Sequence, residues 1–149
     1  MSVKNIKLEK NAVQIFSSFV EADDADKRFW HDQTARQRLE ALELCVKVRM
    51  GMKIQIPKDF REFLKLLKEN EVEYLLIGGY AVGYYGYPRP TGDMYIWISC
   101  SYQNAKKIVS VSNQFGFTAS ELSVELFTQE KSIVRMGVAP FRLEISHLY

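Results

Sequence analysis

The sequence has few of the features that mark disulfide-rich, secreted or membrane proteins. Only two of its 149 residues are cysteines, Cys45 and Cys100, which are too few for a disulfide framework and lack metal-ligand spacing. We therefore expect two reduced thiols in a cytoplasmic protein. No apolar run approaches the roughly 18 residues that a membrane helix needs. The N-terminus has lysines but no apolar stretch typical of a signal peptide.

Charge of either sign is not in excess. The chain has 20 Lys and Arg residues against 18 Asp and Glu, which gives a formal net charge of +2. This balance argues against a strongly basic nucleic-acid-binding protein, although it is compatible with a local basic patch. The hydrophobic share of 47% is sufficient for one buried core, and the length is typical of a single domain.

Several common catalytic motifs are also missing from the sequence. It contains no Gly-x-Ser-x-Gly, no Walker loop and no Gly-x-Gly-x-x-Gly fingerprint, and neither cysteine has a histidine nearby. The two histidines, His31 and His147, lie far apart without accompanying metal ligands, which favours structural roles. His147 lies close to Glu144 in the sequence, so a minor role beside that carboxylate stays open.

Residues 1–52 are expected to form a helical N-terminal segment. Thr34 and Gln37 have the spacing of a capping box, in which the two side chains satisfy backbone N–H groups at a helix start. Residues at helical spacing then follow, and they form an apolar stripe with a charged back: Leu39, Leu42, Cys45, Val46 and Arg49. The acidic run at 21–26 is interpreted as a solvated helical face, because its spacing does not suit a metal-binding loop.

Residues 53–149 are expected to form an α+β domain. A helix is predicted after Pro57, with apolar side chains at i, i+3, i+4 and i+7: Phe60, Phe63, Leu64 and Leu67. A second long helix is predicted between Ser101, as its N-cap, and Gly116. Strands are predicted at 72–77, 94–100, 133–136 and 141–145, and a short helix at 80–85.

The most informative pattern joins two of these strands. The first ends in Gly78-Gly79, and after thirteen residues the second opens on Asp93. Glycines allow backbone N–H groups to approach phosphates at the start of a helix. A carboxylate at Asp93 and another two residues later would point to the same side of the strand, where they could hold a metal ion. Here the second position is Tyr95.

This spacing resembles the signature of the polymerase-β-like nucleotidyltransferase superfamily. Residues 53–146 are similar to bacterial minimal nucleotidyltransferases related to abortive-infection toxins, the AbiEii-type group. Residues 86–93 match the Gly-Tyr-Pro-Arg-x-Thr-x-Asp segment of that group. Residues 137–144 match its Gly-x-x-Pro-x-Arg-hydrophobic-Asp segment, with Glu144 in the last position. The resemblance implies a mixed sheet flanked by helices, with residues 1–52 as a helical extension.

The same resemblance implies a two-metal reaction. Asp93 and Glu144 would hold Mg²⁺, and Gly78 and Gly79 would anchor the nucleoside triphosphate. Arg89 and Thr91 would lie beside the nucleotide, with Arg89 as a phosphate contact. The product would be a nucleotidylated hydroxyl of RNA, protein or a small molecule, with release of pyrophosphate. This assignment requires Asp93 and Glu144 to converge from adjacent strands.

Tyr95 leads to a second hypothesis. A phenol is neutral near pH 7 and brings no charge to a metal site. The domain would then be a non-catalytic interaction or antitoxin-like module, in which the helical segment mediates assembly, including self-association. Residues 17–50 resemble short charged helical proteins that accompany such transferases, so the chain would be a fusion of partner and domain. An ordinary helical extension that completes the core is the alternative for this segment.

Overall fold

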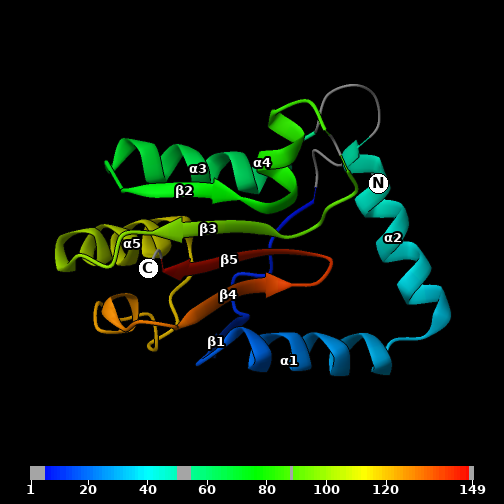
Figure 1. Ribbon diagram of the computed structural model, residues 1–149, viewed down its shortest axis with the longest axis horizontal. Helices are drawn as coiled ribbons and strands as arrows, with labels where there is room; N and C mark the ends of the chain where they lie inside the picture. The colour runs from blue at the N-terminus through cyan, green and yellow to red at the C-terminus, as the bar shows by residue number, and fades with distance from the viewer. Residues whose placement is uncertain (1–5, 50–54, 88, 148–149) are drawn as a thin grey trace.

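The computed structural model describes residues 6–49, 55–87 and 89–147. The elements follow one another in this order: β1 (Val13–Phe16), α1 (Phe19–Asp32), α2 (Ala35–Arg49), α3 (Lys58–Glu69), β2 (Tyr74–Ile77), α4 (Gly78–Tyr84), β3 (Met94–Ile98), α5 (Tyr102–Phe115), the 3₁₀ helix η2 (Leu126–Thr128), β4 (Ile133–Val138) and β5 (Phe141–His147). The predicted α+β class is confirmed (Figure 1).

One mixed sheet organises the molecule. Within the described residues its strand order is β1-β4-β5-β3-β2. The central strands β3 and β5 run parallel, and Tyr95 lies opposite Glu144. The other neighbouring pairs are antiparallel. The two strands that carry the predicted carboxylates are therefore neighbours at the middle of the sheet.

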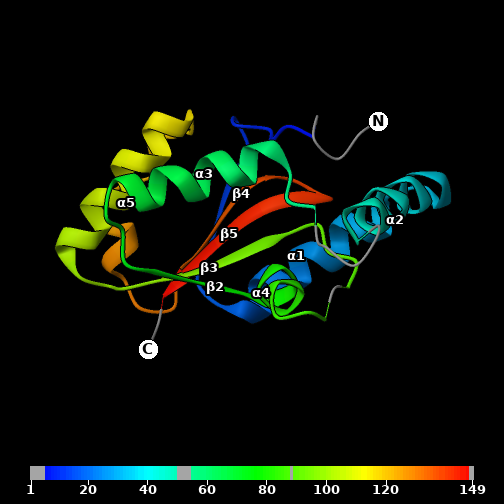
Figure 2. The ribbon, with the colours of Figure 1, turned by 90° about the horizontal axis from the view of Figure 1, so that it is seen from above.

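The sheet has two different faces because side chains alternate along each strand. The apolar face consists of side chains that are almost fully buried: Met94, Ile96, Ile98, Val134, Met136, Leu143 and Ile145. Helices α3 and α5 cover it, and their apolar side chains belong to the same core cluster. Figure 2 shows both helices on one side of the sheet. The opposite side, named here the charged face, includes Tyr95, Arg135, Arg142 and Glu144, and α1 packs against it.

Helix α5 forms where the sequence predicts it. The Ser101 hydroxyl accepts a hydrogen bond from the backbone N–H of Asn104, which satisfies an open donor at the helix start. Gly116 ends the helix with a φ of 106°, in the left-handed region that glycine adopts without strain. In α3, the predicted apolar residues Phe60, Phe63 and Leu67 are fully buried. These two helices hold the apolar face in place.

The N-terminal segment is helical, as expected, but it also adds a strand to the sheet. Strand β1 pairs antiparallel with β4, so that Val13 lies opposite Met136 and Phe16 opposite Ile133. The segment is thus built into the same sheet as the rest of the chain. The predicted change of character at residues 50–52 lies outside the described residues.

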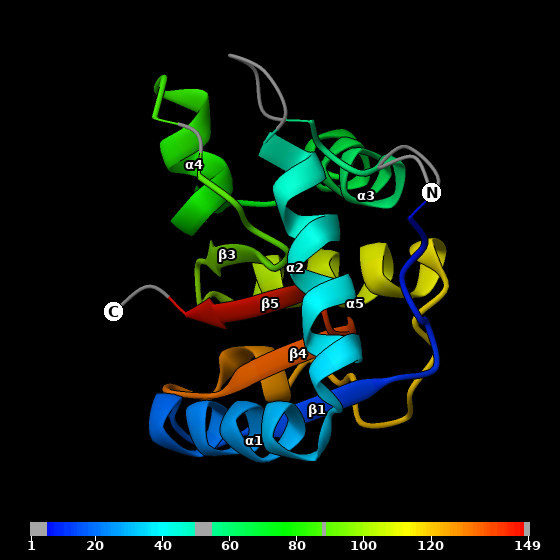
Figure 3. The same cartoon turned by 90° about the vertical axis from the view of Figure 1, so that its right-hand side faces the viewer.

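Helix α2 begins at the predicted capping box. Gln37 accepts a hydrogen bond from the Thr34 backbone N–H at 2.8 Å, and Thr34 Oγ1 accepts one from the Gln37 N–H at 3.3 Å. Much of its predicted apolar stripe is exposed, since Leu39, Leu42 and Val46 are 44–57% accessible. The helix crosses one end of the sheet, from α1 toward α3 (Figure 3). No helix in the described parts of the chain has the length and apolar character needed to cross a membrane.

Candidate functional site

The double-glycine turn connects β2 directly to α4. Gly78 has a φ of +72°, so a side chain at this position would strain the backbone. A Cβ atom on Gly78 would lie 2.9 Å from Cδ2 of Tyr95, and one on Gly79 would lie 2.7 Å from Oγ1 of Thr91. Both glycines are therefore required by close packing within the domain itself.

Asp93 and Glu144 lie on the same face of the two central strands. Asp93 directly precedes β3, and the parallel register places Met94 opposite Leu143 and Tyr95 opposite Glu144. Since side chains two residues apart point to the same side, Asp93, Tyr95 and Glu144 all belong to the charged face. The two carboxylates therefore lie on one face of neighbouring strands, with the phenol of Tyr95 beside them.

Each of the two carboxylates is bound by an arginine of the sheet. The Arg142 backbone N–H and Nε both donate to Oδ1 of Asp93 at 3.1 Å, and Nη2 donates to Oδ2 at 2.5 Å. Arg135 donates to Oε2 of Glu144 from Nε at 3.0 Å and from Nη2 at 2.8 Å. Both guanidiniums are buried, with side chains 4% and 7% exposed. These charge-assisted pairs occupy both Asp93 oxygens and one Glu144 oxygen.

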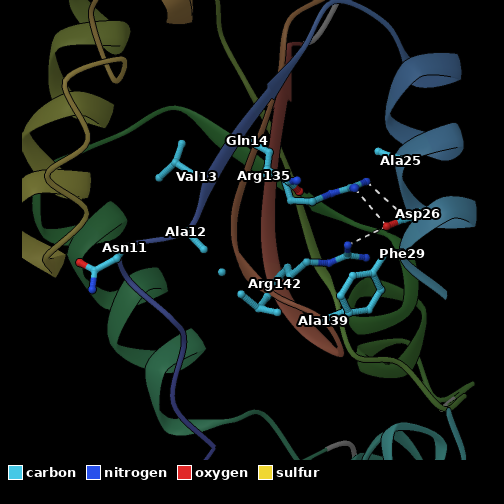
Figure 4. A pocket seen from close by; sticks show the side chains of 12 residues that line it. Asn11, Ala12, Val13, Gln14, Ala25, Asp26, Phe29, Arg135, Ala139 and Arg142 are labelled. Atoms are coloured by element: carbon cyan, nitrogen blue, oxygen red, sulfur yellow. Dashed lines mark hydrogen bonds and ion pairs between the residues drawn. The ribbon is translucent and has the colours of Figure 1, made fainter. Parts of the chain in front are cut away.

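A third carboxylate, from helix α1, joins the two arginines. Asp26 Oδ1 accepts hydrogen bonds from Arg142 Nη1 at 2.6 Å and from Arg135 Nη1 at 3.0 Å. Its Oδ2 accepts one from Arg135 Nη2 at 3.3 Å. Figure 4 shows both arginines reaching from the sheet toward Asp26. We call these five residues the charged cluster: Asp26, Asp93, Arg135, Arg142 and Glu144.

Burial and the charges of the cluster shift the pKa values of two of its members, Arg142 and Glu144, and of the neighbouring Tyr95. Burial alone would lower the pKa of Arg142, but the hydrogen bonds and charges of Asp93 and Asp26 raise it above its ordinary value. Burial raises the pKa of Glu144 above its ordinary value, although the hydrogen bond and the charge of Arg135 act in the opposite direction. Burial and the nearby charges of Asp93 and Glu144 raise the pKa of Tyr95 to about 12, so this phenol stays protonated at neutral pH.

The arrangement does not fit the Mg²⁺ ion that the family resemblance implies. A metal ion needs carboxylate oxygens with available lone pairs directed at one point. Both oxygens of Asp93 already accept hydrogen bonds from Arg142, which brings a positive charge to the position that a cation would take. Tyr95 supplies no negative charge next to them. In this arrangement the arginines, rather than a metal ion, neutralise the carboxylates.

Comparison of the chain with known protein families, curated proteins and solved structures found no match.

The other predicted nucleotide contacts lie in the segment before β3. Thr91 is buried, and its hydroxyl donates to the Asp93 carbonyl oxygen at 3.3 Å, so it supports the backbone at the start of the strand. Arg89 is exposed. Gly92 packs against the β4–β5 turn so closely that a Cβ atom there would overlap the carbonyl oxygen of Pro140. This packing fixes the position of Asp93 beside Arg142.

Three members of the charged cluster were not predicted from the sequence. The sequence predicts a solvated helical face at Asp26, which is wrong for this residue, because its side chain is only 26% exposed and contacts both arginines. Arg142 lies within the matched motif, but the motif predicts no role for it or for Arg135. Alternation along the last two strands could have placed both arginines on one face, provided that the pairing of β4 with β5 was known.

His147 is not part of the charged cluster. Its Nε2 lies 2.8 Å from the Ser132 hydroxyl. Alternation along β5 places it on the face opposite Glu144. The closeness of the two residues in the sequence therefore does not bring their side chains together.

Proposed function

We propose that this protein is a non-catalytic interaction module built on a nucleotidyltransferase-like fold. Helix α1 covers the face where the family resemblance would place metal and nucleotide. The observation that carries this proposal is the chain of contacts from Asp26 through Arg142 to Asp93. These contacts join the N-terminal segment to Asp93, the first predicted metal ligand, and pair the Asp93 carboxylate with a buried guanidinium.

The ancestry in this proposal is supported by the order of elements around Asp93. A strand leads into a double-glycine turn and a short helix, and the next strand opens on the aspartate. A parallel neighbour carries the acidic residue of the second matched segment. This is the order that the motifs of the AbiEii-type group require. The likeness concerns the fold, which can persist when the chemistry of the site has changed.

The loss of catalysis in this proposal follows from charge. A transferase site must hold divalent cations through unoccupied carboxylate oxygens. To release Asp93 for that role, the protein would have to leave the buried guanidinium of Arg142 without its main partner, which is costly in a poorly solvated place. Substitution of Tyr95 for a second carboxylate removes another ligand. The module thus keeps the fold, and arginines of the same chain neutralise its acidic residues.

The interaction role is supported by the outer surface of α2. Leu39, Leu42 and Val46 lie at helical spacing on an exposed side of this helix. Exposed apolar side chains in such a row are typical of a helix that packs against another protein. We therefore propose assembly through α2, with a partner protein or with a second copy of the chain.

Thermal unfolding with and without Mg-ATP tests this proposal. A ligand that binds the native state raises the melting temperature, so a nucleotide-binding site would give a rise of a few degrees at saturating Mg-ATP. We expect no rise, together with a defined oligomer in light scattering that Leu39→Glu disrupts. The exposed substitution Glu43→Gln on the same helix is the control for α2 stability. A clear rise with Mg-ATP would contradict the proposal.

An active Mg²⁺-dependent nucleotidyltransferase is the second candidate. It is favoured by the placement of Asp93 and Glu144 on one face of adjacent strands. It would transfer a nucleotide from a nucleoside triphosphate to a hydroxyl of an RNA or protein acceptor. Transfer of labelled nucleotide should be compared in the wild type, Tyr95→Asp and Tyr95→Phe. Transfer by the wild type would replace our proposal, whereas transfer by Tyr95→Asp alone would identify Tyr95 as the lost ligand position.

A further inference from the structure

Two cavities meet at the ion pair between Asp26 and Arg142. The first, of about 340 Å³, lies between α1 and the sheet, near the β4–β5 turn. The second, of about 410 Å³, lies between α1, α2 and the segment that precedes Asp93. Asp26 and Arg142 line both of them. This ion pair therefore separates two hollows on the same side of the sheet.

Asp26 occupies a position with the features of a carboxylate-binding site. Three N–H groups converge on its two oxygens: Nη1 of Arg142, and Nη1 and Nη2 of Arg135. The two donors from Arg135 contact different oxygens, which is the planar two-point contact that a guanidinium makes with a carboxylate. Both arginine side chains are more than nine-tenths buried and are held by Glu144 and Asp93. Each arginine thus has a second carboxylate partner that holds it besides Asp26.

Apolar side chains form part of the wall on either side of this position, and a larger part in the second cavity than in the first. Ala12, Ala25 and Phe29 line the first cavity, and Figure 4 shows Phe29 beside Arg142. Trp30 and Leu42 line the second. A ligand that reaches the arginines would therefore place its anionic group on the guanidiniums and an uncharged, apolar body against these side chains.

We propose that these cavities bind a small carboxylic acid with an apolar or aromatic body, whose carboxylate takes the place of Asp26 on Arg135 and Arg142. Asp26 is then an internal competitor that occupies the site in the absence of the ligand. The proposal does not depend on the nucleotidyltransferase ancestry, because neither metal nor nucleotide takes part in it.

The charge of the cluster limits the ligand to one negative charge. With Asp26 in place, three carboxylates face two guanidiniums, so the cluster already carries one excess negative charge when all groups are ionised. A monocarboxylate that replaces Asp26 leaves this balance unchanged. A triphosphate would add several unbalanced charges to a largely buried place, at a large cost in free energy.

Asp26 can be displaced because α1 is weakly anchored. Ala22 is the one residue of α1 that is fully buried, and it belongs to a small apolar cluster with Phe16 and Ile133, apart from the main core. A tethered competitor acts at an effective concentration on the order of millimolar. The wild type should therefore bind such acids much more weakly than a variant without Asp26.

Isothermal titration with sodium benzoate, in EDTA and without nucleotide, tests the proposal on the full chain. The variant Asp26→Ala removes the competitor, and Asp24→Ala makes the same charge change on the same helix at an exposed residue that contacts Lys27. We expect Asp26→Ala to bind benzoate at least tenfold more tightly than the wild type or Asp24→Ala do. Benzamide, which has the same shape without the charge, should not bind.

Equal benzoate affinity in Asp26→Ala and Asp24→Ala would overturn the proposal, as would equal binding of benzamide and benzoate by Asp26→Ala. If Asp26→Ala does not fold, as judged by circular dichroism, the wild type decides. Trp30 lines the second cavity, so benzoate should change its fluorescence saturably, whereas Trp30→Phe should lose this signal. No saturable change in the wild type would then reject the site. A negative result with benzoate does not bear on the proposed function, because the Mg-ATP experiment tests that function separately.

Discussion

The two faces of the same sheet are stabilised in different ways. On the apolar face, side chains from β3, β4 and β5 pack against α3 and α5 in a single core. On the charged face, the same strands present Arg135, Arg142 and Glu144, and α1 adds Asp26. The first face gains stability from burial of apolar surface, which depends little on the exact partner. The second depends on particular charge pairs, which are costly to separate.

This difference indicates where the protein can change. An apolar core tolerates substitutions that preserve volume, and the close packing of α3 and α5 on this face leaves little freedom to move. A helix held by one carboxylate on two arginines can be released by a single competing charge. The charged face is therefore the side on which binding and regulation are expected, while the apolar face maintains the fold.

Removal of a large side chain from the apolar face should have the largest effect. Phe63 of α3 is fully buried and packs edge-to-face on Phe115, with ring centroids 5.2 Å apart. We expect Phe63→Ala to lower the free energy of unfolding by about 3–5 kcal/mol, because it removes apolar contacts and leaves a cavity. Urea unfolding followed by circular dichroism measures this loss. Phe19→Ala, at an exposed position of α1, is the control and should have little effect.

Breaking an ion pair on the charged face should have the next largest effect. Arg142→Met leaves Asp93 with a 14% exposed side chain and without its main counter-ion. We expect a loss of about 3 kcal/mol, because the remaining charge is poorly solvated.

The double variant Arg142→Met/Asp93→Leu is its matched control. It replaces both charges by apolar groups and should recover most of the loss, since the cost arises from an unpaired charge. A double variant as unstable as Arg142→Met would show that the contact matters for its shape rather than its charge. The same urea experiment decides between these outcomes.

Substitution of the N-cap residue of α5, one of the two helices that cover the apolar face, should have a smaller effect on stability. Ser101→Ala removes the acceptor for the Asn104 N–H at the start of α5. We expect a loss of about 1 kcal/mol. Ser101→Asp retains an acceptor and should preserve the stability of the wild type. An equal loss in both variants would mean that the cap contributes little.

The smallest expected effect on stability comes from protonation of His147, on the apolar side of β5, as the pH falls. Burial lowers the pKa of His147 below its ordinary value of 6.5. The unfolded chain therefore binds a proton at a higher pH than the folded protein does. The resulting stability is present above pH 6.5 and is lost as the pH falls through the lowered pKa.

Melting temperatures between about pH 7.5 and 5.5 should therefore fall more in the wild type than in His147→Gln, which cannot take up this proton. His31→Gln, at an exposed position, is the reference for histidine replacement in general. A pH dependence that is the same in the wild type and in His147→Gln would contradict the assigned direction of the pKa shift.

The sequence was most informative where structure depends on neighbours along the chain. The cap at Ser101, the end at Gly116 and the capping box at Thr34 are local features, and all three form as predicted. Such patterns reflect local hydrogen bonding and burial, so they can be read without knowledge of the rest of the fold.

The features that the sequence did not reveal depend on distant partners. Strand β1 has four residues and forms against β4, which follows more than a hundred residues later. In the sequence, Asp26 resembles its exposed neighbours Asp23 and Asp24. It differs from them in the folded protein because it binds Arg142, which lies 116 residues away in the chain. A single sequence contains no signal for such a pairing. The charged cluster can therefore be identified only when the order of the strands in the sheet is known.

The long separation between α1 and its partners has a consequence for biosynthesis. Residues 13–32 are synthesised well before β4, which pairs with β1, and before the arginines of β4 and β5 that bind Asp26. During most of translation this first segment has no sheet to join. Its native contacts with β4 and with the two arginines can form only after these later strands have emerged.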